Sequence, residues 1–196
     1  ARQNLSGWSG RGKRHSKGGG SVHTCGNEGN SFAAFALGKL YLAGDAALPR
    51  DPAAALKWLT YAAELGNQFA QYRLGKLLLK GDDGIPKDVI TAIRWLTAAA
   101  KQENGYAEYA LALVYLTGED APKDSVKALS LLKRSAGRGN QFAQYRLGKL
   151  LLQGEDAPKD VKAAIRWLTA AAEQGNQYAQ YALGKLYLLG KEVPKR

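Results

Sequence analysis

The sequence is poor in reactive side chains, with one cysteine, two histidines and no methionine among 196 residues. A single cysteine, Cys25, excludes a disulfide framework within the chain. Both histidines, His15 and His23, lie near the N-terminus, so no Ser/His/Asp triad can be built from the rest of the chain. No apolar run of about 18 residues and no signal-peptide pattern occurs, so we expect no membrane-spanning segment.

Position 1 is alanine and methionine is absent throughout. We therefore expect the chain to be an excised or processed piece of a longer protein. We expect this piece to be cytoplasmic, with secretion as an alternative because the natural N-terminus is not evident.

A repeat with a period of 36 or 37 residues runs through most of the chain. The segment Gly66–Leu79 returns unchanged at Gly139–Leu152. In looser copies a Leu-Gly or Leu-Ala pair is followed about six residues later by glycine and then by proline. A tryptophan also recurs, at Trp58, Trp95 and Trp167, with Leu131 at the equivalent place. Such a period indicates small supersecondary units that bury their apolar faces by stacking.

Each unit is predicted to be a pair of helices. In Phe142–Leu152, apolar residues at spacings of three, four and one form a helical stripe. The next segment, Gln153–Lys159, contains a glycine and a proline, which favour a loop. Asp160 is then well placed to cap a second helix that ends near Gly175. The equivalent caps are Asp51, Asp88 and Asp124, and the equivalent stops are Gly66 and Gly139.

These patterns predict an all-α fold, an α/α superhelix that forms a right-handed solenoid of about 4.5 helix-turn-helix units. The solenoid should cover residues 31–196, with units at 31–67, 68–104, 105–140 and 141–176 and a half-unit at 177–196. Glycine recurs inside the first helix of four copies, where it costs about 1 kcal/mol against alanine. We therefore expect a close helix crossing at Gly38, Gly75, Gly148 and Gly184.

Residues 1–30 differ from the repeats in composition. They are rich in glycine, serine and basic residues, lack apolar periodicity, and carry +4 of the net charge of +11. We interpret them as a disordered basic arm or flexible linker. An alternative is that the arm contacts nucleic acid or another polyanion. The residues expected to do so are Arg11, Lys13, Arg14 and Lys17.

Two short motifs resemble parts of metal or catalytic sites, but the other residues that such sites need are absent. His15, His23 and Cys25 lack a fourth ligand, so they fall short of a closed zinc site. Ser130 and Lys133 match a Ser-x-x-Lys nucleophile motif, but the rest of that signature is absent. We therefore expect no catalytic residues, no metal site and no cofactor.

The repeat pattern resembles the Sel-one-like repeats, which are relatives of the tetratricopeptide repeats. The resemblance covers residues 31–196 and rests on A-x-Y-x-L-G-K-L-Y-x-x-G, a P-K-D loop and A-x-x-W-L-x-x-A-A-x-x-G-N, with departures at Ala112 and Leu131. It implies a superhelix whose concave face is lined by the first helix of each unit and which acts as an adaptor in protein assemblies. Some secreted bacterial members carry a disulfide in each repeat, which one cysteine cannot provide.

A second resemblance concerns the segment Tyr178–Pro194, which is similar to the repeat arrays attached to mobilisation relaxases of gram-positive gut bacteria. It implies a C-terminal accessory region, because no part of the DNA-nicking domain of such proteins is recognisable in the chain. DNA contact would then come from the arm or from a missing domain.

Similarity to tetratricopeptide repeats implies that positions equivalent to 32, 35, 39 and 43 of the first unit face the concave groove. The second of these positions is aromatic in every unit, and the third is lysine in all units but one. The partner-binding residues expected on this face are Phe35, Lys39, Tyr72, Arg73, Lys76, Lys80, Tyr109, Tyr145, Arg146, Lys149, Tyr181 and Lys185. Acidic residues gather instead in the loops between paired helices, which predicts a basic groove with an acidic rim.

The sequence therefore predicts a non-enzymatic scaffold or adaptor that binds an acidic or extended peptide in this groove. An alternative for the tyrosines is packing between neighbouring helices, and an alternative for the lysines is solubility alone. Two further functions stay open. One is a nucleic-acid-associated accessory region of a mobilisation protein, and the other is a structural spacer that self-associates through its C-terminal half-unit.

Overall fold

The computed structural model describes residues 30–81 and 84–189. The secondary structure of these residues consists of α-helices, each 13 residues long, joined by turns and loops. The helices are α2 (Ser31–Ala43), α3 (Pro52–Glu64), α4 (Gln68–Lys80), α5 (Val89–Lys101), α6 (Gly105–Thr117), α7 (Ser125–Gly137), α8 (Gln141–Gln153), α9 (Val161–Glu173) and α10 (Gln177–Leu189). The all-α prediction is confirmed. The arm residues Arg11, Lys13, Arg14 and Lys17 lie outside the described residues.

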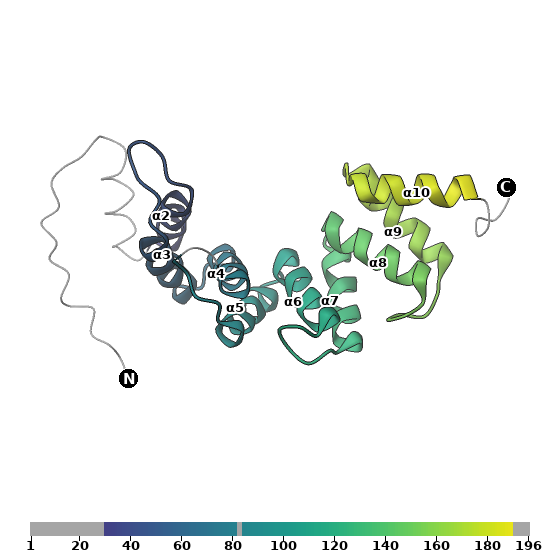
Figure 1. The fold of residues 1–196 in the computed structure, drawn as a ribbon, viewed down its shortest axis with the longest axis horizontal. Helices are drawn as coiled ribbons and strands as arrows, with labels where there is room; N and C mark the ends of the chain where they lie inside the picture. Colours follow the sequence, from purple (N-terminus) through teal and green to yellow (C-terminus); the bar gives the residue numbers. More distant parts are fainter. Residues whose placement is uncertain (1–29, 82–83, 190–196) are drawn as a thin grey trace, which may run out of the picture.

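Consecutive helices pair, and each pair packs on the next, which makes an open solenoid. We call α2, α4, α6, α8 and α10 the A helices, and α3, α5, α7 and α9 the B helices. The stack bends into an arc whose inner side is lined by A helices and whose outer side is lined by B helices (Figure 1). None of the described helices is long and apolar enough to cross a membrane.

The B helices begin where the sequence predicts. Oδ1 of Asp51 accepts a hydrogen bond from the backbone N–H of Ala54 at 2.9 Å, which satisfies a donor that the first turn leaves unpaired. Asp88, Asp124 and Asp160 cap the next three B helices in the same way. The four aspartates therefore fix the start of each B helix.

The A helices begin at asparagines that the sequence analysis did not identify as caps. Oδ1 of Asn67 accepts from the backbone N–H groups of Phe69 and Ala70 at 3.0 and 3.1 Å. Its Nδ2 donates to the carbonyl of Ser31 in the preceding unit at 3.3 Å. Asn140 and Asn176 repeat both functions. Each of these side chains therefore starts a helix and ties two units together.

The predicted close crossings of A and B helices are present in three units. A Cβ placed on Gly75 would lie 2.6 Å from Cγ of Leu96, which is fully buried. Gly38 and Gly148 face Leu59 and Leu168 equally closely, at 2.7 Å. Only glycine fits at these contacts without displacing a core leucine. Gly184 has no such neighbour among the described residues.

Units two and four each have an amide network around a buried glutamine that also bonds to the preceding unit. Nε2 of Gln71 donates to the carbonyl of Ala63 at 3.1 Å, and its Oε1 accepts from Nε2 of Gln102 at 2.8 Å. Gln144 makes equivalent bonds, the second of them with Gln174. Buried polar groups of this kind stabilise a fold only when their partners are in place.

The third unit replaces this amide network with charges. Glu108, at the position of Gln71, is completely buried. Its Oε2 accepts from Nε of Arg138 at 3.2 Å, and its Oε1 lies 2.7 Å from Nη2 of Arg134. The contact with Arg134 is a close ion pair without hydrogen-bond alignment. The charge of the buried Glu108 is thus balanced by two guanidinium groups whose side chains are partly exposed.

Candidate functional site

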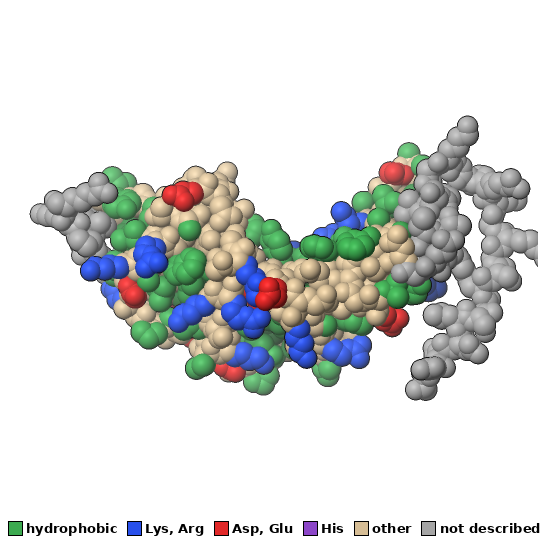
Figure 2. All heavy atoms as spheres, turned by 180° about the vertical axis from the view of Figure 1, so that it is seen from behind, with side chains coloured by type: hydrophobic (Ala, Val, Ile, Leu, Met, Phe, Trp, Pro, Cys, Tyr) green, Lys and Arg blue, Asp and Glu red, His purple; other side chains and the backbone are tan. Residues whose placement is uncertain are grey.

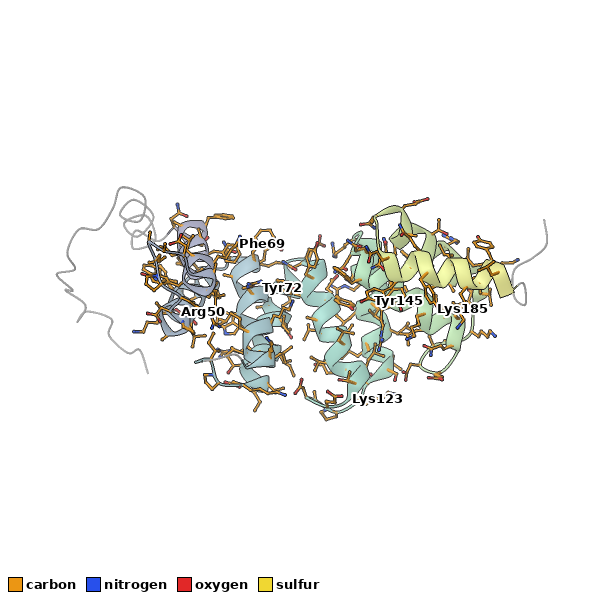
Figure 3. The ribbon with its side chains drawn as sticks, turned by 45° about the horizontal axis from the view of Figure 1, so that its top comes forward. Arg50, Phe69, Tyr72, Lys123, Tyr145 and Lys185 are labelled. Atoms are coloured by element: carbon orange, nitrogen blue, oxygen red, sulfur yellow. The ribbon has the colours of Figure 1, made fainter. Side chains whose placement is uncertain are left out.

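Aromatic side chains pair across successive A helices on the inner side of the arc. In each pair, the ring at the position of Phe35 meets the ring that stands at the position of Phe32 in the next unit. The ring centroids are 5.8 to 6.3 Å apart, within the usual range for aromatic contacts. The pairs are Phe35–Phe69, Tyr72–Tyr106, Tyr109–Phe142 and Tyr145–Tyr178. The labelled rings of α4 and α8 are visible in Figure 3.

The two rings of a pair differ in exposure. Tyr72 and Tyr109 are half-buried, whereas their partners Tyr106 and Phe142 are 53% and 45% exposed. The first ring therefore packs between neighbouring A helices, as the alternative interpretation of the tyrosines expected, while the second offers apolar surface to the groove. Tyr181, in α10, is 73% exposed.

The second member of each pair was missing from the predicted site residues. Phe69, Tyr106, Phe142 and Tyr178 recur in the same register as the residues that were chosen. Sequence reasoning had placed their position on the concave face but had not followed it along the units. The recurrence of an aromatic residue three positions before each chosen one was the available signal.

Burial sets the protonation of the central tyrosines. Loss of hydration raises the pKa of Tyr72 above its ordinary value of 10.0, and the nearby guanidinium of Arg73 opposes this shift. Burial also raises the pKa of Tyr109, with Arg146 opposing. Both phenols are therefore neutral at physiological pH and can donate a hydrogen bond to a ligand.

Cations lie beside the aromatic rows. Nζ of Lys39 lies 5.7 Å from the ring centroid of Phe35, a cation–π contact. Lys76, Lys149 and Lys185 are exposed, and none forms an ion pair with another described residue. The other predicted cations on the A helices are Arg73, Lys80 and Arg146, of which Arg146 is half-buried.

The basic row is interrupted in the middle of the groove. Unit three has Leu113 at the lysine position and Ala110 at the arginine position, so this stretch is apolar. Hydrophobic side chains and Lys or Arg side chains lie next to each other along the hollow in Figure 2. The groove therefore has basic ends and an apolar centre.

Two of the acidic loop residues form ion pairs with the loop of the preceding unit. Asp120 lies 2.6 Å from Nζ of Lys87, and Asp156 lies 2.9 Å from Nζ of Lys123. Asp156 also accepts a hydrogen bond from Oγ of Ser125 at 2.7 Å. These contacts tie each loop to the loop of the preceding unit. The predicted acidic rim is consequently less negative than its composition, and on the described A helices the only acid is the buried Glu108.

Comparison with protein families gives one match, and it is repeated along the chain. The model of the Sel1 repeat matches residues 31–67, 68–104, 105–140, 141–176 and 177–195. No curated protein matches the chain in a sequence comparison.

Among solved structures, the chain is similar to a protective antigen of uropathogenic Escherichia coli that displays an SLR fold, with 35% identity and a TM-score of 0.80 over 89% of this chain. A Sel1 repeat protein from Oxalobacter formigenes is 30% identical, with a TM-score of 0.77 over 86% of this chain. The chain spans 37% of the first protein and 66% of the second.

The cysteine rich protein B of Helicobacter pylori shares the fold at 22% identity and a TM-score of 0.54, over 68% of this chain and 95% of that one. Sel1 repeat proteins generally act as scaffolds for protein interactions. Because the family model matches nearly all of the described solenoid and the helix pairs stack as in solved relatives, the chain belongs to the Sel1 repeat family.

Proposed function

We propose that the chain is a non-enzymatic scaffold whose concave groove binds an extended, acidic segment of a partner protein. The observation that carries this proposal is the combination of exposed aromatic rings and cations on A helices that present no exposed acid among their described residues. Aromatic side chains supply rigid contact area at a small cost in conformational entropy. Lysines steer an oppositely charged partner to the groove and disfavour basic ones.

The distribution of charge specifies the ligand further. The cations of unit two and those of units four and five flank the apolar stretch around Leu113. A segment that suits this groove has acidic residues near both ends and an apolar residue between them. Such a segment would lie along the arc, in the hollow that Figure 2 shows, and would cross several A helices.

The test is a binding titration with a defined peptide. A fluorescently labelled peptide with glutamates at both ends and a central leucine is titrated with the chain, and its anisotropy is measured. The groove variant carries Lys76→Glu, Lys149→Glu and Lys185→Glu. The matched control carries Lys57→Glu, Lys133→Glu and Lys162→Glu, three exposed lysines of B helices, so both variants have the same net charge.

The groove variant is expected to weaken binding at least about tenfold, and the control less than about threefold. Equal weakening by both variants would assign the binding to net charge alone and would contradict the proposal. A DNA duplex serves as a competing polyanion. If the DNA displaces the peptide when its phosphate concentration equals the concentration of peptide carboxylates, the groove is a general polyanion site and not a peptide site.

A further inference from the structure

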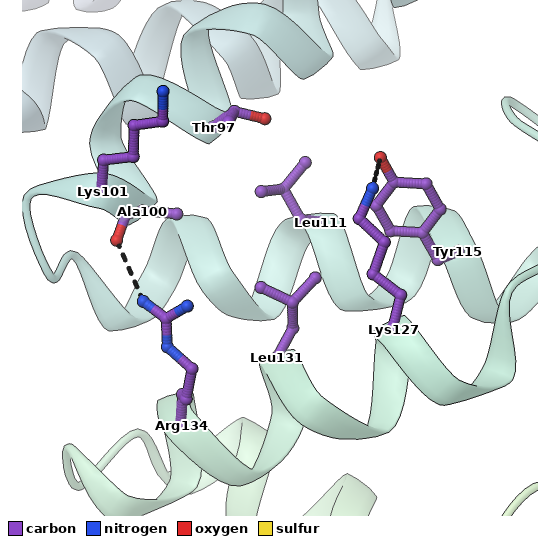
Figure 4. A pocket seen from close by; sticks show the side chains of 8 residues that line it. All are labelled: Thr97, Ala100, Lys101, Leu111, Tyr115, Lys127, Leu131 and Arg134. Atoms are coloured by element: carbon purple, nitrogen blue, oxygen red, sulfur yellow. Dashed lines mark hydrogen bonds between the residues drawn. The ribbon is translucent and has the colours of Figure 1, made fainter.

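A small pocket lies on the opposite side of the solenoid from the groove. It sits between the B helices α5 and α7, with α6 as its floor, and has a volume of about 150 Å³ (Figure 4). Its apolar lining includes Ala100, Leu111 and Leu131. The pocket is open to solvent, and its volume is similar to that of a closed cavity that holds a benzene ring, so it can receive one aromatic side chain.

The pocket lies where unit three has leucine in place of the tryptophan of the other units. Trp58, Trp95 and Trp167 are half-buried and pack against the apolar core, whereas Leu131 stands at their position. Replacing a large core side chain by a smaller one leaves space when the surroundings do not collapse. The space left at Leu131 is open to solvent between the two B helices.

The helices around this space carry more positive charge than those around the tryptophans of the other units. Lys101, Lys127 and Arg134 line the pocket. Their equivalents around Trp95 are Glu64, Thr91 and Ala98, and those around Trp167 are Gly137, Ala163 and Ala170. Neither of those sites has a cation at any of the three positions. The loss of a ring and the gain of cations therefore coincide at one site, between α5 of unit two and α7 of unit three.

Two of the cations are held in place. Nζ of Lys127 donates to the hydroxyl of Tyr115 at 2.8 Å and lies 4.0 Å from the centroid of its ring. Nη2 of Arg134 donates to the carbonyl of Ala100 at 3.4 Å and pairs with Glu108. Both side chains thus keep defined positions at the edge of the pocket, as Figure 4 shows.

The local charges do not cancel. Arg134 and Arg138 are balanced by Glu103 and Glu108. Lys101 and Lys127 have no ion pair with any described residue, so two positive charges remain beside an apolar hole. An occupant with an aromatic ring and nearby carboxylates matches both features.

We infer that this pocket is a docking site for an acidic segment of a partner protein, which inserts one aromatic side chain where the other units have tryptophan. Carboxylates that flank this residue meet Lys101 and Lys127. The chain's own Trp8 is a poorer occupant, because Arg11, Lys13 and Arg14 follow it and would bring positive charge to a positive rim. This inference concerns a different surface from the groove and does not depend on it.

The probe is a labelled peptide with one central tryptophan and two glutamates on each side, titrated with the whole chain. The decisive variant is Leu131→Trp, which fills the pocket with the residue that units one, two and four already accommodate. It is expected to weaken peptide binding at least about tenfold while helix content and thermal stability are kept. Two control peptides, one with alanine in place of the tryptophan and one with lysines in place of the glutamates, should each bind the parent chain at least about tenfold more weakly. Unchanged affinity of Leu131→Trp would overturn the inference.

A second variant decides the matter if Leu131→Trp does not fold. Lys101→Glu with Lys127→Thr copies Glu64 and Thr91, the residues around Trp95, and keeps the apolar lining of Ala100, Leu111 and Leu131. It is expected to weaken binding about tenfold and to reduce the dependence on salt. Unchanged binding would contradict the charge argument, and tighter binding after removal of residues 1–30 would show that the arm occupies the pocket instead. Because this peptide could also enter the groove, the titrations are repeated with Lys76, Lys149 and Lys185 changed to glutamate. Binding that survives in this variant and is lost on adding Leu131→Trp assigns the peptide to the pocket, so the two proposals can fail separately.

Discussion

Nη2 of Arg134 lies 2.7 Å from the fully buried carboxylate of Glu108, so two neighbouring helices of unit three are joined by an ion pair where other units use amides. Arg138 completes the cluster from the end of the same B helix. A buried carboxylate is tolerated only with such partners, since an isolated one would be strongly destabilising. The residues of this cluster should therefore depend on each other.

Glu108→Ala is predicted to lower the free energy of unfolding by about 2–4 kcal/mol, because it leaves a cavity and removes the carboxylate that pairs with Arg134 and Arg138, of which Arg138 keeps Glu103. The triple variant Glu108→Gln, Arg134→Ala and Arg138→Gln copies the amide network around Gln71. It should stay within about 1.5 kcal/mol of the parent, since its substitutions compensate one another. Urea unfolding followed by circular dichroism measures both. A triple variant as unstable as Glu108→Ala would contradict the coupling.

Gly75→Ala is predicted to destabilise the chain although alanine favours helix. The added Cβ would lie 2.6 Å from Cγ of Leu96 and 3.0 Å from the carbonyl oxygen of Ala92. This overlap costs about 1–3 kcal/mol and outweighs a gain of about 1 kcal/mol in helix propensity. Gly137→Ala is the control, because nothing lies within 4 Å of its Cβ position. Thermal unfolding should show a lower midpoint for Gly75→Ala and an equal or higher one for Gly137→Ala.

Tyr72→Ala and Tyr181→Ala should separate packing from binding. Tyr72 is half-buried and contacts Tyr106 across two A helices, so its removal should cost about 1–2 kcal/mol of stability. Tyr181 is 73% exposed, and its removal should change stability by less than about 0.5 kcal/mol. Both changes should weaken the acidic peptide in the groove titration. Full peptide affinity in Tyr181→Ala would remove this end of the groove from the binding surface.

Asp156 is predicted to make the loops sensitive to acid. Hydrogen bonds from Lys123 and Ser125 lower the pKa of Asp156 below its ordinary value of 3.8. Because the folded pKa is depressed, the stabilisation is complete above about pH 4–5 and is lost as the pH falls through the ordinary value and then the folded one. Unfolding measured from pH 6 to pH 2 should show a smaller loss of stability for Asp156→Asn than for the parent. Identical pH profiles would show that this carboxylate does not contribute.

The sequence was sufficient for the fold because its signals are local and repeated. Asp51 and Asp160 precede apolar helical stripes, and the glycine at position 75 marks a close crossing that can be inferred from its cost alone. Such features need no knowledge of which distant residues meet. A period of 36 or 37 residues then fixes how the units stack.

Side-chain contacts between helices were not predictable in the same way, because they join residues about 30 to 36 positions apart, within one unit or between two. Asn67 appears in sequence only as part of a turn, whereas in the fold it also bonds to Ser31. Glu108 and Arg138 replace Gln71 and Gln102 together, but the pairing is evident only when the two helices are placed side by side. In the sequence, Leu131 is evident only as a departure from the repeated tryptophan. The pocket beside it is formed by residues of three helices, which the sequence does not bring together.

The identity of Gly66–Leu79 and Gly139–Leu152 also has a genetic consequence. Recombination between the gene segments that encode the two copies would remove 73 residues without a shift of the reading frame. The amino-acid sequence at the new junction would be the repeated segment itself. Helix α3 would then be followed in the chain by the same fourteen residues as now. The shortened solenoid would keep A helices with aromatic rings and lysines but would lose the Glu108 cluster and the pocket at Leu131. The outer pocket and the apolar centre of the groove around Leu113 would therefore be lost together, leaving a shorter groove with an unbroken row of cations.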